Sequence, residues 1–569
     1  MESLNYPLQY NRQKTRIVNI GRISIGGDNP ICIQSMLTSA TRNIPRCISE
    51  IKSLADVCCE LIRLTIPTRK DLDAIPEIRR IMREEGIEIP LVADIHFSPK
   101  LAVEACELFE KIRINPGNYS DTPRNSRKTS GDNFFEEGYL KLKESIQPLV
   151  KNLLKYNRAL RIGVNQGSLS VRMMERYGDS PQGMVQSALE MITLFEEQGF
   201  EQIVVSLKSS NPIVVQKAYR LLKVKQKAEN AVALHLGVTE AGNGIMGRIK
   251  SLTGIAVLLA DGIGDTIRVS LTEPSTNEII FARKLLKEIF PEQPSEMKKS
   301  EVWKRPLDHR GVVNRLLNLG TLKIGNGEAL KIGQLEGTIL PATDVSFDSD
   351  FTYRIEKTGI RLNQQEEPVL VLSDEQSMRD LDDTGYSALI IDVDNPLFFL
   401  RKHYNSFKDK RSLPVGIVYP VFSDERDHYK ESQIAGLLSE GLIDFLLIPA
   451  EITGDQLIRL LFLLQATRRK IVVTDYIICP SCGRTLFDIE TISAKIKERT
   501  KHLKGLKIGI MGCIVNGPGE MADADFGYVG SGAGKVDLYF GRERVCRGIN
   551  EEDAVDSLIQ LIKDKGRWR

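Results

Sequence analysis

The sequence predicts an α/β protein with three parts: an N-terminal TIM (β/α)8 barrel over residues 1–290, an inserted smaller α/β domain over 291–468, and a C-terminal α+β domain over 469–569. The 569 residues are enough for about three to four domains of ordinary size. Strand-like and helix-like segments alternate regularly in the first part. The last part carries a C-x-x-C pair and a further cysteine in a glycine-rich loop.

Eight strand-like segments in the N-terminal part support the barrel. They lie at 30–36, 61–66, 89–95, 111–115, 160–166, 202–208, 232–240 and 265–271. Most are followed by a helical pattern, for example at 71–84, 181–197 and 274–288. Eight such repeats in about 260 residues match a TIM barrel. A doubly wound sheet is the alternative, but it seldom needs eight regular repeats.

Polar residues stand at the carboxyl ends of these strands, where TIM barrels build their active sites. They are Gln34, Ser35, Arg63, Asp94, His96, Arg113, Asn115, Arg161, Asn165, Lys208, Glu240, Arg268 and Ser270. Five of the eight strands contribute a cation, and burying like charges around one opening is costly unless an anion occupies it.

This ring of cations predicts a strongly anionic substrate, a phosphate or diphosphate, because guanidinium groups bind phosphate oxygens in a bidentate manner. The alternative is that some of the cations are paired with Asp94, Glu240 or Glu273. No second His or Cys stands at ligand spacing from His96, so we expect His96 to contact substrate or to be structural.

Two further segments of the barrel have alternative interpretations. Residues 242–247 formally match the dinucleotide pattern G-x-G-x-x-G. They belong to the seventh unit, however, so we expect these glycines to let the backbone approach a substrate phosphate. The polar segment 119–138 is interpreted as a long loop that acts as a lid.

The middle part predicts a domain without an active site of its own. Residues 291–308 look like a solvated linker. Strand-like runs follow at 369–372, 388–393, 415–421 and 444–448, with helical patterns at 374–381, 430–439 and 455–465. Their ends carry no constellation of catalytic groups. We expect a structural or spacer role, and a binding module for a partner is the alternative.

Three cysteines of the C-terminal part can meet at one soft metal centre. Cys479 and Cys482 form the C-x-x-C pair, and Cys513 follows on its own loop. An iron–sulfur cluster with a different fourth ligand fits this inventory, and Glu520 is the next carboxylate. A zinc site would need His502, and a redox dithiol would leave Cys513 unexplained. Strands are expected at 471–476, 507–510 and 536–540, a hairpin at 530–535 and a helix at 551–563.

Composition excludes several classes of protein. The net charge of +2, from 77 basic and 75 acidic residues, argues against a dedicated nucleic-acid binder. No apolar run approaches the roughly 20 residues of a membrane helix, and residues 1–16 lack the core of a secretory signal. We therefore expect a cytoplasmic protein. Nine cysteines are an odd number, which does not suit a disulfide framework, and those before residue 110 are expected to be mostly buried small hydrophobes.

Motifs in both terminal parts resemble those of the 4-hydroxy-3-methylbut-2-enyl diphosphate synthase family, iron–sulfur enzymes of the non-mevalonate isoprenoid pathway. The C-terminal motifs are CPSCGR at 479–484 and GCIVNGPGE at 512–520. The barrel motifs are QSM at 34–36, ADIHF at 93–97, RINPGN at 113–118, RIGVN at 161–165 and TEAG at 239–242. The resemblance covers residues 12–290 and 470–565. The middle domain is similar to the insertion of the plant-type, three-domain form.

The resemblance implies reductive ring opening and dehydration of 2-C-methyl-D-erythritol 2,4-cyclodiphosphate to 4-hydroxy-3-methylbut-2-enyl diphosphate. Two electrons would come singly from ferredoxin or flavodoxin through a [4Fe–4S] cluster. The implied cluster ligands are Cys479, Cys482, Cys513 and Glu520, and Glu240 would handle protons. The implied substrate contacts are Arg63, Asp94, His96, Arg113, Asn115, Arg161, Asn165, Lys208, Arg268 and Ser270.

The anion site and the cluster would then lie on different domains, so the C-terminal domain must close over the barrel mouth. In two-domain members of the family this closure is thought to occur across a dimer, so a homodimer is one arrangement for this chain. We expect the inserted domain to act as a spacer that sets which barrel is covered. Two other classes remain: a zinc-stabilised barrel enzyme without redox chemistry, and an iron–sulfur carrier, which would need no anion pocket.

Overall fold

The computed structural model describes residues 3–7, 12–120, 132–290, 302–306, 317–319, 322–324, 328–341, 343, 345, 347–356, 359–362, 368–374, 386–410, 413–420, 427–515 and 517–568. The chain forms two compact units. One comprises Arg12–Leu258, Ile263–Lys284 and Val473–Arg569, and the other comprises Met1–Asn11, Leu259–Gly262 and Leu285–Val472.

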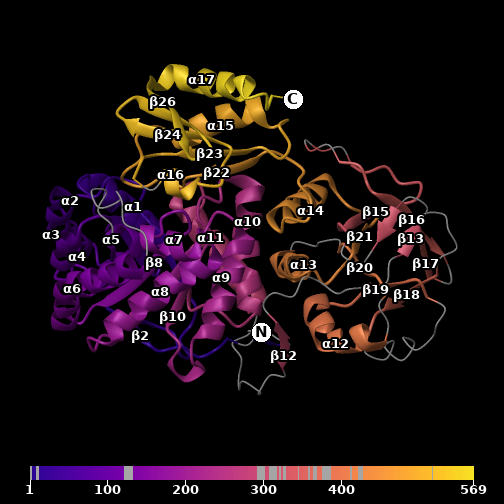
Figure 1. The fold of residues 1–569 in the computed structure, drawn as a ribbon, viewed down its shortest axis with the longest axis horizontal. Coiled ribbons are helices and arrows are strands. Elements are labelled where there is room, and N and C mark those ends of the chain that lie inside the picture. Colours follow the sequence, from indigo (N-terminus) through magenta and orange to yellow (C-terminus); the bar gives the residue numbers. More distant parts are fainter. Residues whose placement is uncertain are drawn as a thin grey trace. The chain divides into compact units, whose positions relative to one another are not determined.

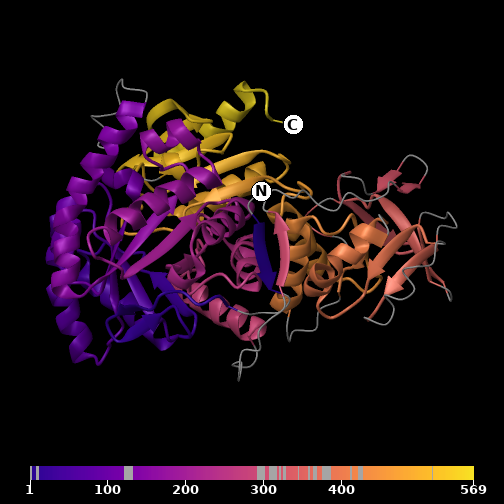
Figure 2. The ribbon, with the colours of Figure 1, turned by 60° about the horizontal axis from the view of Figure 1, so that its bottom comes forward.

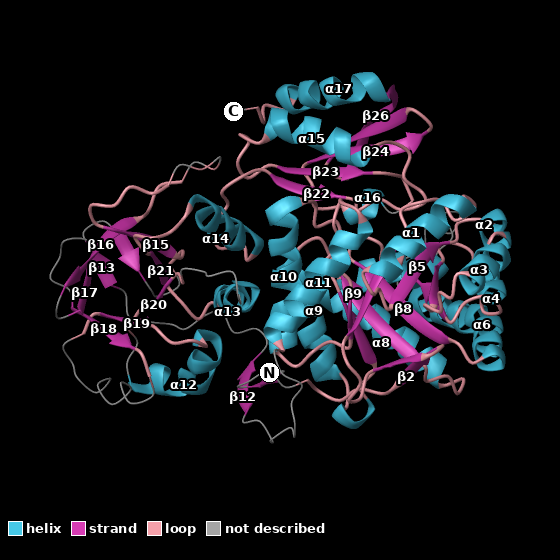
Figure 3. Ribbon diagram, turned by 180° about the vertical axis from the view of Figure 1, so that it is seen from behind, coloured by secondary structure: helices cyan, strands magenta, loops and turns pink. Residues whose placement is uncertain are grey.

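Eight parallel strands close into the predicted barrel in the order β10-β11-β4-β5-β6-β7-β8-β9, with helices around them (Figures 1 and 3). Each strand overlaps one predicted segment, and all are buried, as expected for parallel strands covered on both faces. The strands are β4 Cys32–Met36, β5 Leu61–Thr65, β6 Leu91–Asp94, β7 Lys111–Ile114, β8 Ala159–Asn165, β9 Ile203–Lys208, β10 Ala233–Leu236 and β11 Thr266–Ile267.

The helices between the strands include those predicted, with one difference. The pattern at 71–84 is divided at Ala74 into two helices, because Pro76 starts the second one and lacks the N–H that would continue the first. The described residues of the predicted loop 119–138 are helical, since 119–120 end the helix Pro116–Ser120 and 132–138 begin the helix Asp132–Tyr156, and 121–131 lie outside the described residues. The helices are α1 Ile44–Asp56, α2 Arg69–Asp73, α3 Ile75–Glu84, α4 Pro99–Ala105, α5 Pro116–Ser120, α6 Asp132–Tyr156, α7 Val171–Tyr177, α8 Pro181–Glu196, α9 Pro212–Lys225, α10 Gly244–Ala260 and α11 Ser275–Ile289, with a 3-10 turn at Ala228–Asn230.

The two ends of the barrel differ in chemistry. A hairpin of β2 (Val18–Ile20) and β3 (Ile23–Ile25) closes the amino end, where Val18 and Ile20 pack fully buried against the first residues of the strands. The strand register brings the polar residues together at the other end. Arg113 pairs with Asp94 on one side and with Arg161 on the other. The carboxyl end is therefore the polar one, as predicted.

The C-terminal part is one five-stranded sheet in the order β22-β23-β24-β25-β26. Two helices cover one face over an apolar core that includes Ile496, Ile508 and Leu558, while α16 lies on the other face (Figure 1). The first strand begins four residues later than predicted, because its register with β23 starts at Asp475. The elements are β22 Asp475–Ile478, α15 Ile489–Thr500, β23 Lys507–Met511, α16 Gly517–Glu520, β24 Phe526–Gly532, β25 Lys535–Phe540, β26 Glu543–Asn550 and α17 Glu551–Asp564.

The C-terminal sheet is joined to the barrel in the same compact unit by polar contacts. Lys250 of α10, with only 3% of its side chain exposed, donates to Asp475 Oδ1 at 2.8 Å and to the carbonyl of Tyr476 at 2.9 Å. The Ile478 amide donates to the carbonyl of Glu240 at 3.3 Å. These contacts fix the strand that leads directly into Cys479.

The second unit contains a second closed barrel, of seven strands, where the sequence predicted only a smaller α/β domain. The sequence missed its first three strands and its first helix, and residues 375–381 of one predicted helix lie outside the described residues. The barrel elements are β15 Lys331–Leu335, β16 Phe351–Glu356, β17 Gly359–Leu362, β18 Pro368–Leu372, β19 Ala388–Ile391, α12 Pro396–Lys410, β20 Val415–Val418, α13 Asp427–Glu440, β21 Phe445–Ile448 and α14 Gly454–Ala466.

Part of the predicted linker is a strand. In this unit β12 (Val302–Pro306) pairs antiparallel with β1 (Ser3–Pro7), and the two lie side by side in Figure 2. A short hairpin, β13 (Leu317–Leu319) and β14 (Leu322–Ile324), follows. In the part of the chain that the structure describes, no helix combines the length and apolar character needed to cross a membrane.

Candidate active site

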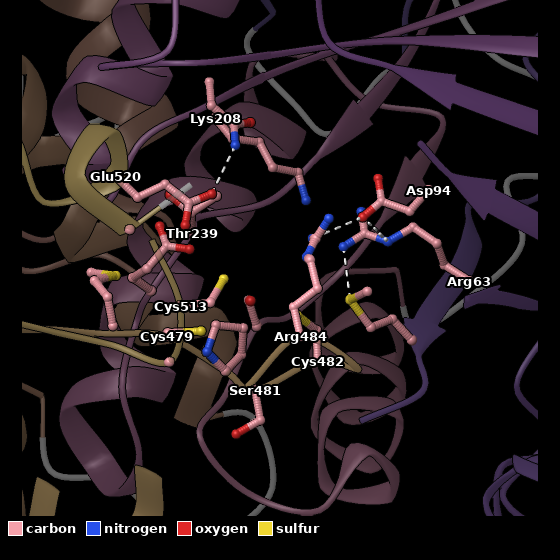
Figure 4. Close-up of a pocket in the computed structure, with 18 of the residues that line it drawn as sticks. Arg63, Asp94, Lys208, Thr239, Cys479, Ser481, Cys482, Arg484, Cys513 and Glu520 are labelled. Atoms are coloured by element: carbon pink, nitrogen blue, oxygen red, sulfur yellow. Dashed lines mark hydrogen bonds and ion pairs between the residues drawn. The ribbon is translucent and has the colours of Figure 1, made fainter. Parts of the chain in front are cut away.

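The carboxyl ends of the barrel strands and the two cysteine loops enclose one cavity of about 70 Å³ (Figure 4). Of the residues predicted to form the site, only Asn115 does not line it. The predicted residues that do are Arg63, Asp94, His96, Arg113, Arg161, Asn165, Lys208, Glu240, Arg268, Ser270, Cys479, Cys482, Cys513 and Glu520. The structure therefore brings the predicted anion site and the predicted metal site together.

Asp94 is the carboxylate around which the cations on one side of the cavity are arranged. Arg113 donates from Nη1 to Asp94 Oδ1 at 2.9 Å and from Nη2 to the carbonyl of Gly163 at 3.1 Å. Arg63 is more distant, with its Nε 4.0 Å from Asp94 Oδ2, and its Nη2 contacts the sulfur of Met36 at 2.8 Å. One carboxylate is thus shared between guanidinium groups and neutralises only part of their charge.

The other cations differ in how well they are paired. Arg268 Nη2 lies 3.3 Å from Glu278 Oε1, whereas Glu273 pairs with Arg248 rather than with a cation of the cavity. Arg161 is only 1% exposed, and its Nε and Nη1 have no hydrogen-bond partner among the described residues. The alternative of internal pairing therefore holds for Arg113 and Arg268 but not for Arg161.

This excess of positive charge perturbs the neighbouring groups. Burial and the charges of Arg161 and Arg268 lower the pKa of Lys208 well below that of a free lysine. Lys111, at the first position of β7, is fully buried and donates to Gln34 Oε1 at 3.2 Å, and burial together with Arg161 lowers its pKa to about 7. Buried cations in this number require an anion to balance them, so the cavity suits a phosphate or diphosphate.

His96 and Asn115 have structural contacts. His96 Nε2 contacts Arg113 Nη1, and burial and the Arg113 charge lower the pKa of His96 to about 3, so the ring is neutral. The Asn115 amide donates to Ser168 Oγ at 3.1 Å and accepts from the Gly117 amide at 3.2 Å. Asn115 therefore orders the loops beside the cavity, and a substrate contact by Asn115 stays a prediction.

Two carboxyl groups, the buried Glu240 and the partly buried Glu520, face each other from the two domains. Asn165 Nδ2 donates to Glu520 Oε1 at 3.1 Å, and Glu240 Oε2 has no hydrogen-bond partner among the described residues. Burial and the charge of Glu520 raise the pKa of Glu240 well above that of a free carboxyl. Glu240 also has a φ of 50°, a conformation uncommon outside glycine that marks functional loops. Burial and the neighbouring Glu520 charge thus favour the protonated form of the Glu240 carboxyl.

The cysteine loops can reach the barrel because glycines stand at the closest approaches. A Cβ at Gly483 would lie 2.8 Å from the carbonyl oxygen of Ser39. A Cβ at Gly167 would lie 1.8 Å from the carbonyl oxygen of Gly519, where φ of Gly167 is +78°. Within the first loop, Cys482 N donates to Thr485 Oγ1 at 2.9 Å. Backbone approaches of this kind bring Glu520 within reach of the barrel residue Asn165.

The chemistry of the donor set fits an iron–sulfur cluster. Three cysteine sulfurs and the Glu520 carboxylate line the cavity, and thiolates are the donors that iron–sulfur centres use. His502, which a zinc site would need, packs edge-to-face against Trp568 with 4.9 Å between ring centroids and does not line the cavity.

The N-terminal cysteines behave largely as predicted. Cys32, Cys47, Cys59 and Cys106 are buried, and Cys58 is exposed. Burial raises the pKa of the Cys59 thiol to about 12, so this thiol is inert. Arg484, by contrast, lines the cavity although it was not among the predicted site residues. Its position two residues after Cys482 of the C-x-x-C pair was the available signal.

Comparisons with known proteins agree with this site. Residues 15–283 match the GcpE TIM-barrel domain, and residues 475–564 match the GcpE protein C-terminal domain. A 4-hydroxy-3-methylbut-2-en-1-yl diphosphate synthase (flavodoxin) of Leptospira interrogans is 37% identical, over 99% of this chain and 98% of its own length. That of Akkermansia muciniphila is 40% identical over the same shares. The chloroplastic, ferredoxin enzyme of Oryza sativa is 37% identical over 98% of this chain and 88% of its own length. The chain therefore belongs to the GcpE family of 4-hydroxy-3-methylbut-2-en-1-yl diphosphate synthases.

Proposed function

We propose that this chain catalyses the reductive ring opening and dehydration of 2-C-methyl-D-erythritol 2,4-cyclodiphosphate to 4-hydroxy-3-methylbut-2-enyl diphosphate. Two electrons and two protons enter the reaction, and one water molecule leaves. The observation that carries the proposal is that Cys479, Cys482, Cys513 and Glu520 line the same cavity as the buried cations. A carrier of electrons would need no such cation-lined cavity, and a phosphate-binding barrel would need no such cysteines.

We propose that these four residues hold a [4Fe–4S] cluster, which when bound supplies electrons to the substrate one at a time. Three thiolates are the soft donors that iron–sulfur centres use, and a carboxylate provides a more labile fourth ligand. Relatives are named as flavodoxin or ferredoxin enzymes. This supports one of these two small redox proteins as the electron donor.

The chain's own residues bind the substrate and handle its protons. Arg161 and Lys208 neutralise the diphosphate, since their charges are the least balanced by protein carboxylates. Asp94 orients Arg113 and holds it in place for the same task. Glu240 holds a proton beside Glu520 and can give it to the departing oxygen. Because Arg161, Lys208 and Glu240 are each at most 5% exposed, these interactions act at a lowered effective dielectric constant.

We propose that residues 1–290 bind the diphosphate, that 469–569 carry the cluster, and that 291–468 serve as a spacer. Relatives that match this chain over 98% or 99% of its length support an insertion shared with them. A homodimer and a cytoplasmic location stay predictions. Deleting the inserted domain tests the spacer role: the variant should lose turnover while keeping its cluster, and full turnover would contradict that role.

Anaerobic reconstitution with iron and sulfide tests the function. The protein should become brown, with broad visible absorbance, and should convert the cyclic diphosphate to the linear product with dithionite or reduced flavodoxin as reductant. Mass spectrometry of the product identifies the reaction. A colourless protein with stoichiometric zinc, or a cluster-loaded protein that leaves the cyclic diphosphate unchanged, would overturn the proposal.

A further inference from the structure

Arg484 is the one cation lining the cavity that comes from the C-terminal domain, among the residues the structure describes. The others, Arg63, Arg113, Arg161, Lys208 and Arg268, all stand at barrel strand ends. Arg484 follows Cys482 by two residues, and about 10% of its side chain is exposed. In Figure 4 it extends from the cysteine loop toward Asp94 and Arg63.

The guanidinium of Arg484 has partners in the protein but keeps one unused donor. Its positive charge is balanced by Cys482, Asp94 and Cys513, and the Cys482 side chain accepts a hydrogen bond from it. Its Nη2 lies 3.5 Å from Asp94 Oδ2, which is beyond a good charge-assisted hydrogen bond. Its Nε is buried and has no hydrogen-bond partner within the described ranges. Asp94 is shared, since Arg113 lies 2.9 Å and Arg63 4.0 Å from it.

A buried guanidinium with an unpaired donor is costly, because its N–H groups have lost water without gaining an acceptor. An anion that enters the cavity beside Asp94 would supply the acceptor that Nε lacks. Arg63 and Arg113 face the same position from the barrel. A diphosphate carries oxygens on two phosphorus atoms, so it has enough acceptors to bind donors of both domains at once. A single side-chain carboxylate has too few acceptors to do this.

We propose that Arg484 is a substrate-binding residue: it completes the diphosphate site from the C-terminal domain, so that diphosphate binding and closure of that domain over the barrel favour each other. This deepens the proposed function and rests on it for the identity of the substrate. Since coupling between two equilibria is reciprocal, the diphosphate should stabilise the contacts between the domains, and the loss of Arg484 should weaken diphosphate binding.

The test uses the full-length, cluster-loaded, oxidised protein with inorganic diphosphate as the probe and isothermal titration calorimetry as the measurement. Removing one charged hydrogen-bond donor should weaken binding by roughly 10- to 100-fold in R484Q. R484K, which keeps the charge but loses the planar fork, should give an intermediate affinity. R542Q is the matched control, because Arg542 also pairs across the domains, with Asp179 at 3.0 Å, but is 60% exposed and lies outside the cavity. Its affinity should stay within about twofold of the unmodified protein.

A second readout separates substrate binding from a merely structural ion pair. The Ile478 amide, which bonds to the Glu240 carbonyl of the barrel, should exchange its hydrogen more slowly when diphosphate is added. This protection should be lost in R484Q and kept in R542Q. A purely structural Arg484 would instead speed exchange without ligand and leave the diphosphate affinity unchanged, and that result overturns the proposal. If R484Q does not fold, the same two measurements, diphosphate affinity and exchange of the Ile478 amide, are made on R484K and decide between the two roles of Arg484.

The two proposals can fail separately, because diphosphate binding is measured without turnover. Normal turnover with equal diphosphate affinity in R484Q and the unmodified protein would overturn the role of Arg484 alone. A protein that binds diphosphate through Arg484 but leaves the cyclic diphosphate unchanged would overturn the proposed reaction and leave the anion site standing.

Discussion

Replacing Lys111 by methionine should stabilise the barrel, and more so at pH 7 than at pH 9. Lys111 is fully buried at the start of β7, and its side chain donates a hydrogen bond to Gln34 Oε1 at 3.2 Å. Burial and the nearby Arg161 charge lower the pKa of Lys111 from 10.5 to about 7. Methionine has a similar length and shape but carries no charge, so K111M removes this penalty and keeps most of the packing.

The sign and size follow from proton linkage. Between pH 7 and 10.5 the unfolded chain binds a proton at Lys111 that the folded chain does not, so in the unmodified protein this group lowers stability as the pH falls. One pH unit corresponds to about 1.4 kcal/mol. The penalty is therefore on the order of 4 to 5 kcal/mol at pH 7 and about 2 kcal/mol at pH 9. The free energy of unfolding of K111M should exceed that of the unmodified protein by these amounts.

Hydrogen exchange of the amides in β8, the strand beside Lys111, measures the opening free energy of the barrel at both pH values. K141M is the matched control: Lys141 has 74% of its side chain exposed, so its loss should change stability by less than about 0.5 kcal/mol at either pH. A K111M variant that is less stable than the unmodified protein, or whose advantage does not shrink between pH 7 and 9, would refute the reasoning.

Three further outcomes are expected. K250M removes the buried cation that binds Asp475 and the Tyr476 carbonyl, so contacts between the domains should weaken by about 3–5 kcal/mol; faster exchange of the Ile478 amide shows this, and K250M combined with D475L should recover part of the loss. E520Q should keep three cysteine ligands and most of the visible absorbance of the reconstituted protein but lose turnover by about 100-fold or more, and unchanged turnover would reject Glu520 as a ligand. C59A should leave the iron content unchanged, because the Cys59 thiol is buried in the barrel and its pKa is raised to about 12; reduced iron would contradict this.

The barrel could be predicted because its sequence signals are local. Each strand is a short apolar run, and a polar residue such as Arg113 or Asn165 at its end identifies the active end before any contact is known. The inserted barrel was missed because signals of this kind are weak there. Strand β17, Gly359–Leu362, is short, and its hairpin with β16 pairs Arg354 with Arg361, so no clear apolar run marks it.

The contacts between the domains could not be predicted from the sequence. Arg484 and Asp94 are far apart in the chain, and neither the cysteine motif nor the barrel pattern indicates that they meet. The start of β22 was misjudged for a similar reason: residues 471–473 are apolar, but the strand begins where pairing with β23 begins, at Asp475. Long-range pairing decides these features, and a single sequence contains no direct signal of it.

The approach of Gly167 to Gly519 has a consequence for repeated opening and reclosure. Because the cavity is only about 70 Å³, we expect the domains to separate to admit substrate and to release product. At this point backbone meets backbone, since a Cβ on Gly167 would overlap the Gly519 carbonyl and a Cβ on Gly519 would lie 2.7 Å from the Gly167 carbonyl. No side chain has to be reordered there when the domains meet again, so this contact adds no rotamer entropy to the cost of closing. Each closure can then return Glu520 to the same distance from Asn165.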